Sequence, residues 1–346
     1  MCNVKCEILN VKYLTRTGIL FIALTALTLM LLLVDIGVGS LRLSVGEVCS
    51  ALFGRCVDPA VTKIVVDIRL IKALVAIIAG IALSVSGLQM QTLFRNPLAG
   101  PYVLGVSSGA SLAVAIFLLG APLFGSLSPS IASIGMTGAA LAGAGAVLAL
   151  VAIVGRRIKD IMVLLILGMM ISSGISAIVQ ILQYLSADES LKSFVIWTMG
   201  ALGNVTSAQL PILAAAVITG LILAVITIKP LNLLLLGEEY AVTMGLNMRS
   251  QRTLILISTA LLAGSVTAFC GPIGFIGLAL PHVARALFAT ADHRILIPGA
   301  ALVGAATMLA CDLISKQLAL PVNAITALIG IPIVIWIVFK SKDFAS

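Results

Sequence analysis

Long runs of apolar residues, separated by short polar or charged segments, divide this 346-residue chain. A membrane-spanning helix needs roughly 20 mostly apolar residues. Ten runs approach that length and predict ten spans, at residues 18–34, 71–93, 98–120, 131–155, 161–185, 210–228, 254–270, 274–289, 295–311 and 322–339. The first run follows a basic segment, but no small-residue cleavage site follows it. We therefore expect a retained helix there and not a signal peptide.

The composition agrees with a membrane protein. Hydrophobic residues make up 61% of the chain and charged residues 10%, whereas ordinary globular domains have about 45–50% and about 25%. A soluble fold of this size could not cover so much apolar surface. We therefore expect an all-α polytopic membrane protein. Soluble enzymes and nucleic-acid-binding domains are excluded, and nucleic acid is not expected as a partner despite the net charge of +8.

The basic residues favour one orientation in the membrane. Lysine and arginine collect on the cytoplasmic side of membrane proteins. If both termini are cytoplasmic, 14 of the 21 basic residues lie inside and 7 outside. We therefore expect a multi-pass protein of the inner (plasma) membrane with both termini in the cytoplasm. The outside residues concentrate between Arg42 and Lys72, and this cluster needs an explanation of its own.

Breaks in the apolar pattern suggest two related halves. Asn96-Pro97 follows the second run, and Gly271-Pro272 follows the seventh, which is the matching position if each half holds five runs. Halves with an odd number of spans have opposite orientations, as in many transporters. We expect one transmembrane domain over 1–346, with inverted halves at 16–190 and 205–346. The breaks are interpreted as parts of a pathway or gate, although ordinary helix ends would look the same.

Two further patterns concern packing and a covalent bond. Small residues recur four apart, as in Gly80 with Ser84 and Ala300 with Gly304, and this spacing predicts closely packed helices. Cys49 and Cys56 share one expected external loop and could form a disulfide. The spacing leaves this pairing open.

Residues that support catalysis or ion coupling are scarce. The sequence has no Gly-x-x-x-x-Gly-Lys-Ser/Thr phosphate loop and no clustered His or Cys ligands. We therefore expect no nucleotide hydrolysis by the chain itself, no metal site and no cofactor. The acids Asp35, Asp67, Asp160 and Asp312 fall at expected helix ends. A proton-driven transporter usually needs an acid at mid-membrane, so a pathway driven from outside the chain is favoured. An ion-coupled secondary transporter of a small solute is the alternative.

The longest expected cytoplasmic loop, at 229–252, has the pattern of a docking element. Glu238 and Glu239 open a short amphipathic segment, and acids are favourable in the first turn of a helix. A turn at Gly245 leads to a basic segment with Arg249. This arrangement suggests contact with a cytosolic partner, and a plain interfacial connector is the alternative.

Four ordered motifs carry a resemblance to a known family. They lie at 87–110, with Asn96, Pro97, Gly105 and Gly109; at 236–245; at 271–285, with Gly271 and Pro272; and at 291–294. Together they resemble the iron-chelate and vitamin B12 (FecCD) permease family, the membrane subunits of type II ABC importers. The similarity extends from about residue 20 to the C-terminus.

The resemblance implies a complex and a transport activity. It implies ten spans per subunit and a homodimer with a central pathway, surrounded by membrane lipid. It also implies two cytosolic ATP-binding subunits and a periplasmic or surface-anchored substrate-binding protein. The permease would translocate an iron-chelate (siderophore), haem or corrinoid across the inner membrane, driven by ATP hydrolysis on the partner subunits. The sequence does not distinguish these substrates, and an oxyanion also stays open.

The same resemblance assigns roles to individual residues. Those implied to couple to the ATPase are Gly237, Glu238, Glu239, Ala241, Gly245 and Arg249. Those implied to line the pathway or its gate are Ser172, Ser176, Gln180, Gln183, Trp197 and Gly200. Those implied to dock the binding protein are Arg69, Lys72 and Lys316, where Lys72 replaces an arginine common in the family. Headgroup anchoring is the alternative for these basic residues.

Overall fold

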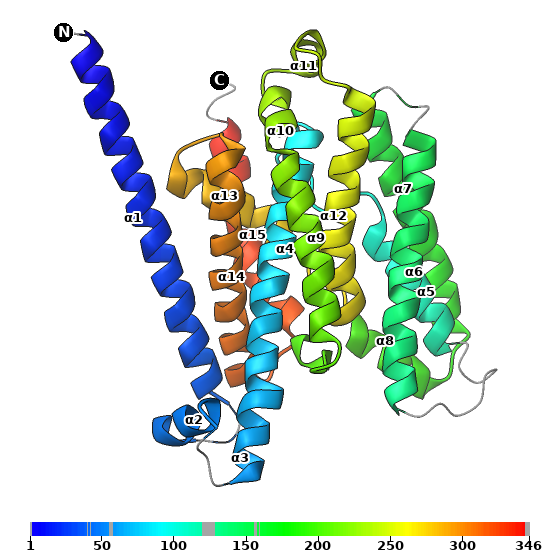
Figure 1. The fold of residues 1–346 in the computed structure, drawn as a ribbon. Coiled ribbons are helices and arrows are strands. Elements are labelled where there is room, and N and C mark those ends of the chain that lie inside the picture. The colour runs from blue at the N-terminus through cyan, green and yellow to red at the C-terminus, as the bar shows by residue number, and fades with distance from the viewer. Residues whose placement is uncertain are drawn as a thin grey trace.

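The computed structural model describes residues 2–39, 41, 43–54, 58–119, 129–155, 158 and 160–342, which form helices and no strand (Figure 1). The elements are α1 (Cys2–Gly37), α2 (Val45–Leu52), α3 (Pro59–Lys63), the π-helical segment η1 (Ile64–Leu70), α4 (Ile71–Leu93), α5 (Val106–Leu119), α6 (Pro129–Gly155), α7 (Ile161–Tyr184), α8 (Asp188–Thr198), the 3₁₀ turn η3 (Leu202–Asn204), α9 (Leu210–Ile226), α10 (Ile228–Leu234), α11 (Glu238–Thr243), α12 (Met248–Cys270), α13 (Ile276–Phe288), α14 (His293–Leu318) and α15 (Val322–Lys342).

The all-α expectation is confirmed, since every range expected to cross the membrane holds a helix. Five described helices are long and apolar enough to span a bilayer, and they lie within α1, α6, α7, α12 and α14. α9 and α10 qualify together as a sixth span with a bend of 52°. α5, α13 and part of α15 are shorter apolar helices. The count of ten spans therefore stays a prediction.

Two expected boundaries are wrong. The third span was expected from residue 98, but residues 95–105 form turns and α5 begins at Val106. Proline at 97 and 101 removes backbone donors, and Gly105 has a φ of 79°, so the chain cannot continue as a helix there. The loop expected at 229–252 is shorter, because Asn247 caps α12 by accepting a hydrogen bond from the Ser250 N–H at 3.2 Å.

Small residues bring α4 close to its neighbours at the centre of the bundle. Gly80 on α4 faces Gly304 on α14, and a Cβ on either one would clash with the carbonyl of the other. A Cβ on Gly87 would likewise clash with the carbonyl of Gly277 on α13, and a Cβ on Gly277 would clash with the carbonyl of Leu83 on α4. The expected close packing is therefore confirmed at these positions. In lipid, such contact between backbones replaces part of the hydrophobic effect that drives soluble folds.

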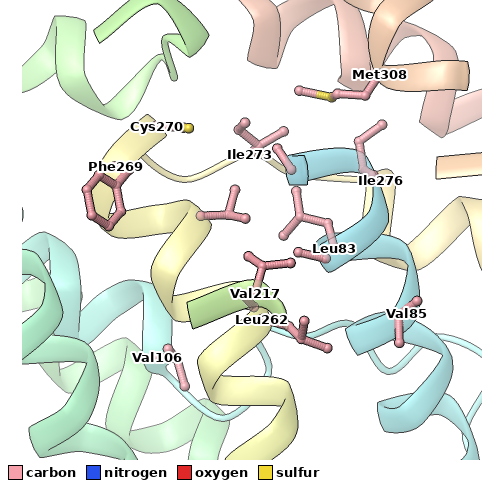
Figure 2. Packing of buried hydrophobic residues seen from close by; sticks show 14 of the residues in the cluster. Leu83, Val85, Val106, Val217, Leu262, Phe269, Cys270, Ile273, Ile276 and Met308 are labelled. Carbon is pink, nitrogen blue, oxygen red and sulfur yellow. The ribbon is translucent and has the colours of Figure 1, made fainter. Parts of the chain in front are cut away.

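Apolar side chains fill the space between these helices (Figure 2). Leu83 on α4, Val217 on α9, Leu262 on α12 and Met308 on α14 are all buried. These side chains come from both halves of the sequence, so the halves share one core.

The two ends of the bundle carry different elements (Figure 1). α11 lies at one end, together with the start of α1 and the end of α15, and we call this end the α11 side. α2, α3 and α8 lie at the other end, which we call the α2 side. α4 runs from the α2 side to the α11 side, and α12 runs the opposite way. This arrangement supports inverted halves, and the division at 16–190 and 205–346 stays a prediction.

Candidate functional site

The residues expected to couple to an ATPase form a short helix between two glycine turns on the α11 side. Gly237 enters α11 with a φ of 114° and Gly245 follows it with a φ of 85°, both in the left-handed region that favours glycine. Ala241 is buried, and its carbonyl accepts a hydrogen bond from the Leu246 N–H at 3.0 Å. The expected helix with Glu238 in its first turn is confirmed.

The two acids of α11 differ in their surroundings. Glu238 pairs with Arg252 of α12 at 3.1 Å, and Arg252 also donates a hydrogen bond to the Ile158 carbonyl at 3.2 Å. Glu239 is exposed. Glu238 therefore fixes α11 against α12, whereas the carboxylate of Glu239 stands on the open surface.

The surface around α11 combines this acid with apolar groups and a hollow. Leu236, Tyr240 and Met244 are exposed at 63%, 47% and 60%. Arg249 lines a hollow of about 560 Å³ at the start of α12, with Asn247 and Ser250. A protruding helix, exposed apolar side chains and an adjacent hollow give this side the features of a protein interface.

Three of the four polar residues expected on the pathway lie together along α7. Ser176, Gln180 and Gln183 line a hollow of about 260 Å³. Ser172 instead donates a hydrogen bond to the Gly168 carbonyl at 2.8 Å. The opposite wall comes from α5 and α8 and was not expected; its residues are Ser107, Ser108, Ser111, Phe194 and Thr198.

The expected gate residues Trp197 and Gly200 pack against the break between α12 and α13. Trp197 is buried, and a Cβ on Gly271 would clash with its carbonyl. Gly200 has a φ of 74° and lies against the Pro272 carbonyl. Asn323 ties the start of α15 to the same break by accepting a hydrogen bond from the Gly274 N–H at 2.9 Å. The turn before the last helix is thereby attached to the break between α12 and α13.

The first family motif forms the turns between α4 and α5. Asn96 accepts a hydrogen bond from the Leu98 N–H at 2.9 Å, and the Pro97 carbonyl lies 2.7 Å from the Nε2 atom of His282 on α13. Near the end of the motif, Gly109 of α5 lies so close to Gly143 of α6 that neither has room for a side chain. The motif therefore closes a turn and allows tight helix packing.

The three basic residues expected to dock a partner all have partners within the chain on the α2 side. Arg69 is only 5% exposed and donates hydrogen bonds to the carbonyls of Ile36, Gly37 and Leu41. Lys72 pairs with Asp312 at 2.9 Å. Their docking role stays a prediction, and the structure gives them an internal role that the sequence did not reveal.

Lys316 completes a buried charge cluster with Lys72, Asp35 and Asp312. Its Nζ atom lies 2.7 Å from Asp35 and 2.8 Å from Asp312. The side chains of Asp35 and Asp312 are 0% and 1% exposed. Asp312 was expected at a helix end, but α14 continues to Leu318, so Asp312 lies inside the helix. The cluster joins α1, α4 and α14.

A Cys49–Cys56 bond remains a prediction, since Cys56 lies outside the described residues.

Comparison with known proteins identifies the family. The model of the FecCD transport family matches residues 27–340. The chain belongs to the FecCD transport family. The FecCD recognition made from the four motifs is thus confirmed.

Individual relatives cover most of the FecCD chain. It is 36% identical over 321 residues to the hemin transport system permease protein HmuU of Yersinia pestis, which covers 91% of this chain and 95% of that protein. It is 37% identical over 279 residues to the vitamin B12 import system permease protein BtuC of Salmonella paratyphi A. This match covers 80% of this chain and 83% of BtuC. A solved structure described as an inward-facing conformation of a metal-chelate type ABC transporter has a TM-score of 0.81 and 30% identity, covering 92% and 98%.

Proposed function

We propose that this chain is the membrane-spanning permease subunit of an ABC importer, and that ATP hydrolysis on separate cytosolic subunits drives it. The α11 surface carries the proposal, because a short helix between two glycine turns, with Glu239 and Tyr240 exposed, projects from one end of the bundle. Such a helix can fit a groove of a partner protein. The family membership supports an ATPase as that partner.

The proposed mechanism starts at α11. Each ATPase holds one α11 helix through Glu239 and the neighbouring apolar side chains. When ATP closes the two ATPases, α11 moves with them and shifts the helices attached to it. The hollow along α7, lined by Ser176, Gln180 and Gln183, forms part of the pathway, and Trp197 and Gly200 belong to its gate on the α2 side.

The assembly proposed around the chain has two sides. Two copies form a homodimer in the inner membrane, with the α11 side and both termini in the cytoplasm. A substrate-binding protein docks on the α2 side. Because Lys72 and Lys316 are paired internally, they would contribute to docking through the part of the cluster that stays accessible; the side chain of Lys72 is 23% exposed.

The proposed substrate is a haem, a corrinoid or an iron-chelate such as a siderophore. The relatives named for hemin and vitamin B12 support this class. Large rigid substrates suit a wall of serine and glutamine side chains, which can form hydrogen bonds without holding a charged ligand tightly. Selection among the three would then rest mainly on the binding protein.

Co-purification tests the proposed function. The permease is purified in detergent with its cytosolic ATPase, and ATP hydrolysis is measured with a binding protein loaded in turn with hemin, cyanocobalamin or a ferric siderophore. A stable complex whose hydrolysis responds to one loaded ligand supports the importer and names the substrate. A permease that binds no ATPase in several detergents would overturn the proposal.

A further inference from the structure

The last turns of α4 carry three buried polar side chains that reach different helices. Gln89 donates a hydrogen bond to Thr227, between α9 and α10, at 3.2 Å and accepts one from Ser258 of α12 at 3.1 Å. Gln91 donates to the Leu278 carbonyl of α13 at 2.9 Å and accepts a hydrogen bond from Arg285. These groups lie at the end of α4 that faces the α11 side, where the loop helices join the bundle.

Thr92 extends this network through a histidine to α10. The Thr92 hydroxyl lies 2.8 Å from the Nε2 atom of His293, and the Nδ1 atom of His293 lies 2.7 Å from the Oδ1 atom of Asn232. Asn232 also accepts from the His293 N–H at 2.9 Å and donates to Asp292 at 2.7 Å. Since the Asn232 oxygen can only accept, it holds the proton on Nδ1 and leaves Nε2 as an acceptor. The single proton of the Thr92 hydroxyl is then shared between Nε2 and the Leu88 carbonyl, which lies 3.0 Å away.

α10 is therefore attached to α4 at both of its ends. Thr227, at its beginning, contacts Gln89, and Asn232, two residues before its last residue, reaches Thr92 through His293. Only Thr227 separates α9 from α10, and the two helices bend by 52° there. After α10, the chain reaches α11 within three residues, at Leu235, Leu236 and Gly237.

The polar contacts are better suited to transmit a shift than an apolar contact would be. His293 is 1% exposed and Thr92 is 4% exposed. A hydrogen bond fixes both distance and direction, and in a dry interior it is expensive to leave a donor or acceptor unpaired. Apolar side chains are also closely packed, but their contacts do not fix a direction in this way. A displacement of α10 must therefore move α4 and α14 with it or break the hydrogen bonds that link Asn232, His293 and Thr92.

We propose that Asn232, His293 and Thr92 are positioning residues that convert a displacement of α11 into a movement of α4 and α14. The inference rests on the proposed function, because it takes the ATPase as the source of the displacement. It adds the route by which that displacement enters the central helix of the bundle. Without the route, α10 and α11 would move about the bend at Thr227 and leave α4 in place.

Spin-label distances test this route in the assembled complex. A nitroxide is attached at Leu318→Cys, a 59% exposed position at the end of α14, in a chain whose other exposed cysteines are replaced by serine. The distance between labels on the two permease copies is measured in lipid nanodiscs with the ATPase bound, before and after trapping with ATP and vanadate. ATPase binding, ATP hydrolysis and thermal stability are measured on the same samples.

Four variants separate transmission from folding. Thr92→Val removes the hydroxyl but keeps the shape, and Thr92→Ser restores the hydroxyl. Asn232→Leu removes all three hydrogen bonds of the side-chain amide, one to Asp292 and two to His293. Thr219→Val is the matched control, since that exposed α9 hydroxyl bonds only to the Ala215 carbonyl of its own helix at 2.8 Å.

The expected result is a loss of movement without a loss of the partner. Thr92→Val and Asn232→Leu bind the ATPase and hydrolyse ATP, but the fraction of labels that shifts falls about fivefold or more, the lower end of typical coupling between sites. Thr92→Ser and Thr219→Val shift as the unmodified chain does. A full shift in Thr92→Val and Asn232→Leu overturns the route and leaves the proposed function standing. The route is also overturned if the fraction of shifted labels falls only as much as ATPase binding and thermal stability fall in the same variant. In that case the residues support the fold and do not transmit movement. An unmodified chain that binds no ATPase overturns both proposals.

Discussion

The ammonium group of Lys72 lies 2.9 Å from a carboxylate oxygen of Asp312, inside the same chain. The sequence predicts a residue that faces a binding protein, whereas the structure pairs it with a buried acid of α14. Lys316 binds both Asp312 and Asp35, so the two positive charges of the lysines balance the two negative charges of the carboxylates within one cluster. The α2 side is therefore held together by charge as well as by packing.

Asp312→Ala is expected to destabilise the folded permease by about 3 kcal/mol or more, because removing one partner of a buried ion pair leaves the other charge uncompensated. The free energy of unfolding is measured in detergent with a chemical denaturant. Asp188→Ala, an exposed position in the first turn of α8, is the control and should cost well under half as much. Equal effects of the two substitutions would show that the cluster adds nothing special to stability.

Gly304→Ala is expected to destabilise the bundle, because the new Cβ would meet the Gly80 carbonyl and force α4 and α14 apart. Overpacking of this kind costs about 1–3 kcal/mol. Gly145→Ala on α6 is the matched control, since nothing lies within 4 Å of the added atom. There the substitution should stabilise by about 0.5–1 kcal/mol through helix propensity. Thermal unfolding of the two variants checks this: the unfolding temperature should fall for Gly304→Ala and rise for Gly145→Ala. Changes of the same sign in both variants would contradict the close approach of α4 and α14 at Gly80 and Gly304.

Glu239→Lys is expected to weaken binding of the ATPase, because the exposed carboxylate belongs to the proposed contact surface. The loss should shrink as salt is added, since exposed charges are screened over about 10 Å at 0.1 M. Affinity measured at two salt concentrations checks this. Glu238→Gln is the informative comparison: it breaks the 3.1 Å pair with Arg252 and should loosen α11 with little dependence on salt. Unchanged affinity for Glu239→Lys at low salt would remove that residue from the interface.

Asp292→Ala is expected to destabilise the start of α14 by about 1 kcal/mol at neutral pH, as loss of an N-cap does. The Arg294 N–H, followed by the Asn232 amide, lowers the pKa of the Asp292 carboxyl. A lowered folded-state pKa means that the stabilisation is present above the unfolded value of about 3.9 and is lost as the pH falls through the folded value. The difference in unfolding free energy between the two proteins should therefore disappear at strongly acidic pH. A difference that persists there would contradict the role of the ionised cap.

The apolar pattern predicted the helices well, since a bilayer requires long apolar segments and hydrogen-bonded backbone. The structure also confirmed the helix that begins at Glu238, because glycine turns and first-turn acids are local signals. The sequence missed α2, although Ser44 and Glu47 form a capping box there.

Contacts between distant residues could not be read from the sequence. Nothing near Lys72 indicates that Asp312 lies opposite, 240 positions later in the chain, and nothing near Thr92 indicates His293. Such pairs depend on which helices become neighbours, which periodicity does not specify. The same limit explains why the wall of serines on α5 was missed, although the α7 side of that hollow was expected.

Transport in vesicles tests the central claim most directly. The permease and its ATPase are reconstituted into phospholipid vesicles, and uptake of hemin, cyanocobalamin and a ferric siderophore from the binding protein is measured with ATP, with a proton or sodium gradient, and with neither. We predict uptake of one of these substrates that requires ATP and persists when ionophores collapse the gradients. Uptake that follows an ion gradient and ignores ATP would contradict the account and favour an ion-coupled secondary transporter.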